Sequence, residues 1–117
     1  MKGRVSMSRV TYNVSITPSV AMDLIKKFQY ANADLVHEEY NEVDKDRSIG
    51  TLIYEKYYFR SRNRAALIVI IDNFKEKTNI RVIATGSSEG MILNFDWGAA
   101  NNFVKSVEKI LDEYIIE

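Results

Sequence analysis

Hydrophobic and polar residues alternate strictly near the start of the chain, over residues 8–16. Every second position from Val10 to Ile16 is apolar, and the positions between them are polar. A repeat of two residues puts all the apolar side chains on one side of an extended backbone, so this segment is predicted to be a half-buried β-strand. We expect residues 1–7, which precede it, to form a disordered leader.

A helical repeat replaces this alternation after Thr17–Pro18. A threonine hydroxyl can accept a hydrogen bond from a free amide at a helix start, and proline at the first helical position loses no hydrogen bond. The pattern predicts a helix over residues 18–31. The apolar side of this helix would consist of Val20, Ala21, Leu24, Ile25 and Phe28.

The middle of the chain is predicted to be a series of strands. Residues 34–47 fit a helical stripe about as well as they fit alternation, and we predict a strand there. The segments that follow Gly50 are rich in aromatic and β-branched residues and are separated by polar turns, as expected for an antiparallel meander. They cover residues 51–59, 66–74 and 80–86, with residues 91–95 as a candidate short last strand.

The last part of the chain, residues 97–116, has the clearest helical pattern. Its apolar stripe is formed by Phe103, Val107, Ile110, Leu111 and Tyr114, and is widened by Val104 and Ile115. Burial of each such side chain is worth about 1.5–3 kcal/mol, so the docking of this helix is expected to be a leading contribution to stability.

This order of elements predicts an α+β fold in which four or five antiparallel strands form a curved sheet, packed on a long C-terminal helix. The order resembles the helix-grip arrangement of TATA-box-binding-protein-like and START-like domains. The resemblance implies a fold and no particular activity.

The size and composition of the chain limit the classes of protein to which it can belong. Its 117 residues, 46% hydrophobic and 27% charged, suit one folded domain spanning residues 1–117. Cysteine is absent, which excludes disulfides and thiol chemistry and favours a cytoplasmic location. The longest apolar run, residues 65–71, is too short to cross a bilayer, so we expect no membrane association.

The charge of the chain argues against a nucleic-acid partner. Sixteen Lys and Arg residues balance sixteen Asp and Glu residues, whereas nucleic-acid binding depends on unopposed positive charge. Three arginines, Arg60, Arg62 and Arg64, are clustered between two predicted strands. Their guanidinium groups are suited to contact an anion, although a solvated hairpin tip explains the same residues.

Both faces of the predicted sheet are apolar. A five-residue loop at 60–64 would pair Tyr57 with Leu67 and Ile53 with Ile71. The opposite face would then contain Leu52, Tyr54, Tyr58, Ile68, Ile70 and Phe74, joined by Val82 and Ala84. One face can pack on the C-terminal helix, and the other needs a cover, for which the first helix, a second subunit or a ligand are candidates. We hypothesise a homodimer.

Ionisable residues with catalytic or metal-binding potential are few. His37 is the only histidine, and on a strand it shares a face with Glu39 and not with Glu38, so we expect it to be structurally incidental and expect no metal site. Glu55, Lys56 and Asp72 lie in apolar strands, where burial can shift a pKa and where edge positions are an equal explanation.

A more distinctive motif, Phe95-Asp96-Trp97-Gly98-Ala99, precedes the last helix. Asp96 is suited to cap this helix, and Trp97 to close it against the sheet. Together with Gly86 and Gly90, the motif resembles that of a small family of uncharacterised bacterial proteins, chiefly from Firmicutes. The resemblance implies no activity, because the family is a domain of unknown function.

These observations lead to two functional hypotheses. In the first, the domain is non-catalytic, and acts as a dimeric interaction module or as a binder of an apolar small molecule between sheet and C-terminal helix, without a cofactor. Candidate lining residues for such a ligand are Tyr54, Tyr58, Trp97 and Phe103. The alternative is a small enzyme using carboxylate and lysine acid-base chemistry, for example Glu55 with Lys56.

Overall fold

The computed structural model describes residues 5–28, 33–58, 63–87 and 97–116. Five strands, two α-helices and one 3₁₀ helix lie in these ranges. In chain order they are β1 (Val5–Val14), α1 (Pro18–Phe28), β2 (Asp34–Glu42), β3 (Ser48–Tyr58), β4 (Asn63–Lys75), β5 (Lys77–Ser87), α2 (Trp97–Ile110) and the 3₁₀ helix Asp112–Tyr114. The predicted strand over residues 34–47 is confirmed in its first nine residues, and the candidate strand at 91–95 lies outside the described residues.

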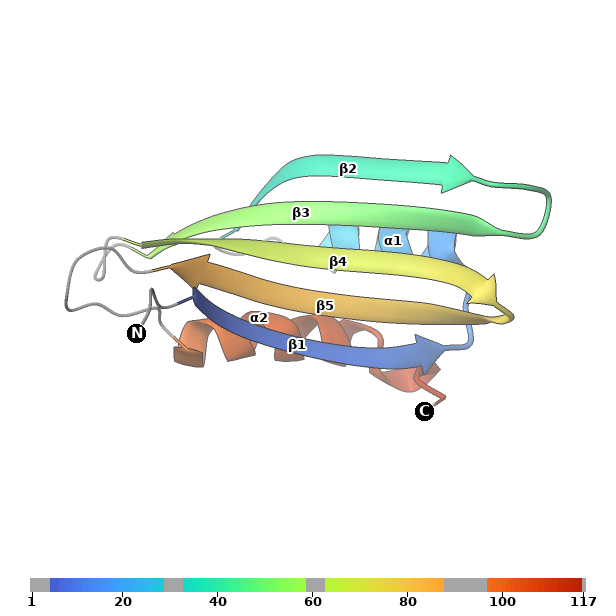
Figure 1. The fold of residues 1–117 in the computed structure, drawn as a ribbon. Coiled ribbons are helices and arrows are strands. Elements are labelled where there is room, and N and C mark those ends of the chain that lie inside the picture. Colours follow the sequence, from blue (N-terminus) through green and yellow to red (C-terminus); the bar gives the residue numbers. More distant parts are fainter. Residues whose placement is uncertain (1–4, 29–32, 59–62, 88–96, 117) are drawn as a thin grey trace.

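The strands form one antiparallel sheet in the order β1-β5-β4-β3-β2, so that β4 is central and β1 and β2 are the edges. Both helices lie on the same side of this sheet (Figure 1). Helix α1 packs on β3 and β4, and α2 packs on β5 and β1. The α+β class and the packing of the sheet on the C-terminal helix are thus as predicted.

The side of the sheet that contacts the helices, called here the inner face, forms one wall of the core. Its buried strand residues are Tyr12, Val14, Leu52, Tyr54, Ala65, Leu67, Val69, Ile71, Ile80, Val82 and Ala84. The helical side of the core is formed by Ala21, Met22 and Ile25 of α1 and by Phe103, Val104 and Val107 of α2, with Leu111 just beyond it. The predicted stripe of the C-terminal helix is therefore the stripe that docks.

Helix α1 begins at the predicted residue, but the side that it packs against the sheet differs from the predicted apolar side. The Val20 amide donates a hydrogen bond of 3.4 Å to the Thr17 hydroxyl, which caps the helix. Val20 was expected on the apolar side but is 44% exposed, and Met22 is buried in its place. Met22 reaches the sheet at Gly50, where an added Cβ would lie 2.7 Å from the Met22 sulfur. Gly50 belongs to β3, and because it has no side chain, Met22 of α1 can come close to the sheet at this point.

The C-terminal helix is shorter than the predicted range of 97–116. It ends at Ile110, and a 3₁₀ turn then brings the chain back to β1, where Ile115 pairs with Val14. Two backbone hydrogen bonds fix this return, from Ser15 N to Tyr114 O at 2.8 Å and from Ile116 N to Asn13 O at 2.9 Å. The leader prediction is wrong for Val5–Met7, because these residues already belong to β1 and pair with Thr85–Ser87 of β5.

The predicted register of β3 and β4 is also wrong. Tyr58 pairs with Asn63, so four residues connect the strands instead of five, and Ile53 pairs with Ile68 instead of Ile71. A register shift of three residues, an odd number, exchanges the faces of one strand relative to the other. Leu52 and Tyr54 consequently share the inner face with Leu67 and Val69, and Ile68 and Ile70 lie on the opposite side.

Candidate functional site

The side of the sheet that faces away from α1 and α2, called here the outer face, has no described helix over it (Figure 1). Its centre is an isoleucine row in which Ile53, Ile68 and Ile83 are paired in register on β3, β4 and β5. Ile70 extends this row along β4, and all four side chains are only partly exposed. The first helix is thereby excluded as the cover of the second face.

Charged residues of opposite sign border the isoleucine row on its two sides. Glu39 on β2 and Glu55 on β3 lie toward one edge of the sheet, and Arg9 on β1 and Arg81 on β5 lie toward the other. Glu55 is paired with Arg64 and Arg81 with Asp72, so the acidic β2 side rests on Glu39 and the basic β1 side on Arg9.

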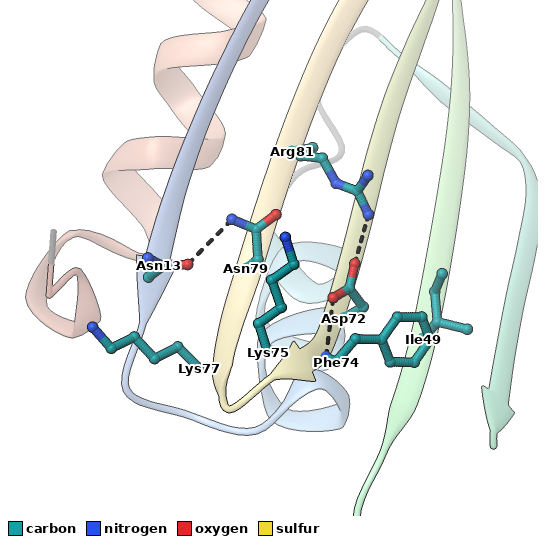
Figure 2. A pocket seen from close by; sticks show the side chains of 8 residues that line it. All are labelled: Asn13, Ile49, Asp72, Phe74, Lys75, Lys77, Asn79 and Arg81. Carbon is teal, nitrogen blue, oxygen red and sulfur yellow. Dashed lines mark hydrogen bonds and ion pairs between the residues drawn. The ribbon is translucent and has the colours of Figure 1, made fainter. Parts of the chain in front are cut away.

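A cleft of about 620 Å³ lies at one end of the outer face, beside the β4–β5 turn. Figure 2 shows its lining, which is Asn13, Ile49, Asp72, Phe74, Lys75, Lys77, Asn79 and Arg81. These side chains come from β1, β3, β4 and β5, so the cleft is formed by strands that are distant in the sequence.

An ion pair between β4 and β5 forms the floor of the cleft. The Arg81 guanidinium donates a hydrogen bond of 2.5 Å to Asp72 Oδ2, and the Phe74 amide donates one of 3.2 Å to Asp72 Oδ1. The Asp72 side chain is only 11% exposed, so both of its oxygens are engaged within the protein. The Arg81 Nε atom is buried, and no described residue accepts a hydrogen bond from it.

Two lysines and two asparagines complete the polar lining. Lys75 and Lys77 are paired directly across a tight turn, in which Glu76 adopts a positive φ of 79°. Lys75 extends over the sheet toward Asn79, and Lys77 extends in a different direction, away from Lys75 (Figure 2). The Asn79 amide donates a hydrogen bond of 3.1 Å to Asn13 Oδ1.

The residues predicted to line a ligand site beneath the sheet are only partly brought together. The Tyr54 and Phe103 rings pack with centroids 5.9 Å apart, and both residues are buried in the core. Tyr58 lies in β3 and Trp97 begins α2, and both side chains are outside the described part of the structure. A ligand at these four residues stays a prediction.

Two buried tyrosine hydroxyls, those of Tyr12 and Tyr54, have no hydrogen-bond partner among the described residues. Burial, with a smaller contribution from the charge of Glu38, raises the pKa of Tyr54 to about 12. Burial and, secondarily, Glu108 raise the pKa of Tyr12 above its ordinary value. Both hydroxyls are thus held protonated, and neither is poised for acid-base chemistry near neutral pH.

The arginine cluster is described only in part, because Arg60 and Arg62 lie outside the described residues. Arg64 is the second residue of β4, is exposed, and forms an ion pair of 3.2 Å with Glu55. Its guanidinium also lies 5.4 Å from the centre of the Tyr57 ring. Arg64 is thus engaged on the sheet, and anion binding by the cluster stays a prediction.

The candidate catalytic and metal-binding residues do not converge. Glu55 and Lys56 are adjacent on β3 and so project to opposite faces, and Glu55 is paired with Arg64. His37 Nε2 lies 3.2 Å from Glu39 Oε2 in an exposed pair. Within the described residues, no group of three or more His, Asp or Glu side chains is placed to hold a metal ion.

Sequence reasoning identified Asp72 as an ionisable group in an apolar strand but did not connect it with Arg81, Lys75 or Lys77. Asp72 and Arg81 become neighbours only through the β4–β5 register, which shifts between Asp72 and Lys75. The available signal was a pair of opposite charges, at positions 72 and 81, within two otherwise apolar strands.

None of the described helices is both long and apolar enough to span a membrane. The structure defines an α+β domain whose five-stranded antiparallel sheet has helices on one face and an apolar centre with a polar cleft on the other. The chain belongs to the DUF6054 family, a family of unknown function, whose model matches residues 7–115. This membership agrees with the predicted resemblance to an uncharacterised family.

The comparison with curated proteins found no match. Among solved structures, the chain is similar to the one titled "Crystal structure of Ara h 8.0201", with a TM-score of 0.44 and 10% sequence identity. That match covers 94% of this chain and 99% of the other.

Proposed function

We propose that this domain is a non-catalytic cytoplasmic interaction module that forms a homodimer through its outer face. The observation that carries the proposal is that α1 and α2 both pack on the inner face, which leaves the isoleucine row with no described cover. A sheet that faces water on one side ordinarily alternates apolar and polar residues, and an apolar outer face favours a partner.

The arrangement of the isoleucines suggests how two copies fit. With a two-fold axis parallel to β4, Ile68 of one copy lies against the partner's Ile68, and Ile53 lies against the partner's Ile83. Strands of the two sheets then run nearly parallel, which is the aligned mode of sheet-on-sheet packing. The interface is the same patch on both copies, as two-fold symmetry requires.

The charges on the outer face select the same axis. Rotation about β4 brings the β2 side over the partner's β1 side, so that Glu39 lies two residues along the strands from the partner's Arg9, a distance that the long arginine side chain can span. Rotation about an axis across the strands would instead place β2 on β2, acid against acid. Complementary charges of this kind steer association and fix register more than they add affinity.

The size of the outer face suits a weak contact. Strand spacings of about 4.8 Å and about eight residue steps of about 3.3 Å give this five-stranded face a plane of roughly 19 Å by 26 Å. Two such planes cover about 1,000 Å² in total, below the roughly 1,200–2,000 Å² of stable interfaces and within the range of transient ones. A dimer that dissociates on dilution is expected.

We also propose the helix-grip arrangement for the fold, supported by the pairing of β1 with β5 and by the position of α2 across both. Binding of an apolar small molecule between sheet and α2 stays a second proposal. The two buried hydroxyls without described partners favour it, and the packing of Tyr54 on Phe103 argues for a filled core there.

The experiment is sedimentation velocity over a concentration series, with Ile68→Lys as the disrupting variant. Ile68→Lys should be monomeric where the natural chain is dimeric, because it places two like charges face to face on the symmetry axis. Val43→Lys, which adds the same charge at an exposed apolar residue outside the sheet, should leave the dimer intact. A natural chain that is monomeric at tens of micromolar would overturn the proposal.

A charge exchange tests the axis. Arg9→Glu and Glu39→Lys should each weaken the dimer, and the double variant should restore it, because the exchanged charges again face each other. If the double variant is weaker than both single variants, the axis does not run along β4. Circular dichroism confirms that each variant is folded.

A further inference from the structure

We propose that the cleft at the β4–β5 end of the outer face is a binding site for a small oxyanion, a phosphate or carboxylate group, carried on an apolar or aromatic body. The inference goes beyond self-association and does not require it, because a single copy supplies every lining residue. The volume of about 620 Å³ is within the range of small-molecule sites.

The charges of the lining favour an anion. Lys75, Lys77 and Arg81 supply three positive charges, and Asp72 supplies the single negative charge. Both Asp72 oxygens already accept hydrogen bonds, from Arg81 and from the Phe74 amide, so the carboxylate is matched within the protein. Two positive charges in the cleft remain for a ligand.

Arg81 is held in place before any ligand arrives. Its guanidinium is fixed by a carboxylate that is almost fully buried, while its own side chain is 41% exposed. A guanidinium that is fixed on one side by a carboxylate and exposed on the other is suited to the recognition of an oxyanion.

The two lysines supply the unmatched positive charge of the cleft. Lys75 and Lys77 are paired across the turn, but their side chains diverge, with Lys75 extending over the sheet toward Asn79 (Figure 2). Both side chains line the cleft, so an oxyanion bound in it is attracted by both.

The remaining lining residues define what carries the oxyanion. Phe74, which is 44% exposed, and Ile49 form an apolar wall beside the charged groups. An exposed aromatic ring at the edge of a charged cleft favours stacking of a flat or apolar group. The ligand class is therefore a compact organic phosphate or carboxylate and not a bare inorganic ion.

The experiment is a titration of the ¹⁵N-labelled protein with phenyl phosphate, benzoate, inorganic phosphate and, as the neutral control, benzamide. Phenyl phosphate should shift amides around Asp72, Lys75 and Arg81, and benzamide should not. A stronger response to phenyl phosphate than to benzoate identifies a phosphate site, and the reverse identifies a carboxylate site. If neither shifts these amides, the proposal is wrong.

Variants locate the binding. The double variant Lys75→Gln/Lys77→Gln should weaken phenyl phosphate binding by about tenfold or more, because two charge-assisted contacts are lost. The matched control Lys45→Gln/Lys105→Gln removes two exposed lysines outside the cleft and should leave binding unchanged. Phe74→Ala should weaken phenyl phosphate binding and leave inorganic phosphate binding nearly unaffected. Equal weakening in the cleft and control variants would show general charge attraction and overturn the site.

The same titration on Ile68→Lys keeps this proposal separate from the dimer. A monomeric Ile68→Lys protein that still binds phenyl phosphate supports the cleft by itself. Loss of binding in Ile68→Lys, with retention in the dimeric Val43→Lys control, would contradict the assignment of the complete site to one copy.

Discussion

The inner and outer faces of the sheet contain nearly the same kinds of side chain and differ in what lies over them. Along β4, Leu67, Val69 and Ile71 are fully buried, while Ile68 and Ile70, which alternate with them, are only partly buried. The difference comes from α1 and α2, which cover one face. Hydrophobicity along β4 thus does not distinguish the two faces, and the placement of the helices determines which one becomes the core.

The largest expected effect contrasts two neighbouring isoleucines of β4. Ile71→Ala should lower the free energy of unfolding by about 2–5 kcal/mol, because it leaves a cavity in the core. Ile70→Ala should lower it by about 1 kcal/mol or less in the monomer, since water or neighbours can fill the space. Urea unfolding at low protein concentration measures both. Equal losses would mean that the outer face is as fully packed as the core.

An intermediate effect is expected at the Asp72–Arg81 pair. Asp72→Ala removes a nearly buried carboxylate and leaves the Arg81 guanidinium without its acceptor, at an expected cost of about 1–3 kcal/mol. Glu38→Ala breaks the exposed Lys26–Glu38 pair and should change the unfolding midpoint very little. If Asp72→Ala is as mild as Glu38→Ala, the polar part of the outer face behaves as ordinary surface.

The smallest effect concerns a hydroxyl on the inner face. Tyr54→Phe removes a buried oxygen that has no described partner, so stability should stay unchanged or rise by up to about 1 kcal/mol. The control is Tyr40→Phe, at a tyrosine that is 40% exposed and should be neutral. A clear loss of stability in Tyr54→Phe would show that the hydroxyl is bound in solution.

The same tyrosine predicts a dependence on pH. Its pKa is raised to about 12 in the folded protein, against about 10 in the unfolded chain, so between these values the unfolded state binds fewer protons. Stability is fully present below pH 10 and falls as the pH rises toward 12. Tyr54→Phe should make this fall shallower, and Tyr12→Phe should act in the same direction. Thermal unfolding between pH 9 and pH 12 measures it.

The sequence predicted most of the elements and the apolar residues on both faces of the sheet, because local periodicity and side-chain chemistry determine both. It did not predict the pairing of β3 with β4. The observed connection is one residue shorter than the predicted loop, and the register differs by three residues. An odd shift of this kind exchanges the faces of one strand relative to the other. Val20 and Met22 were equally hydrophobic candidates for the core, and the space above Gly50 selected Met22. The cleft was missed because its residues meet only through long-range strand pairing.

The edge strand β2 has a further consequence for contacts between molecules. All nine of its residues are exposed, and β2 forms one edge of the sheet. Another strand could therefore pair with its free backbone edge and extend the ladder. Asp34, Glu38, Glu39 and Glu42 make a second β2 an unfavourable neighbour, because carboxylates would crowd against carboxylates. Polymer growth from this edge is thereby discouraged.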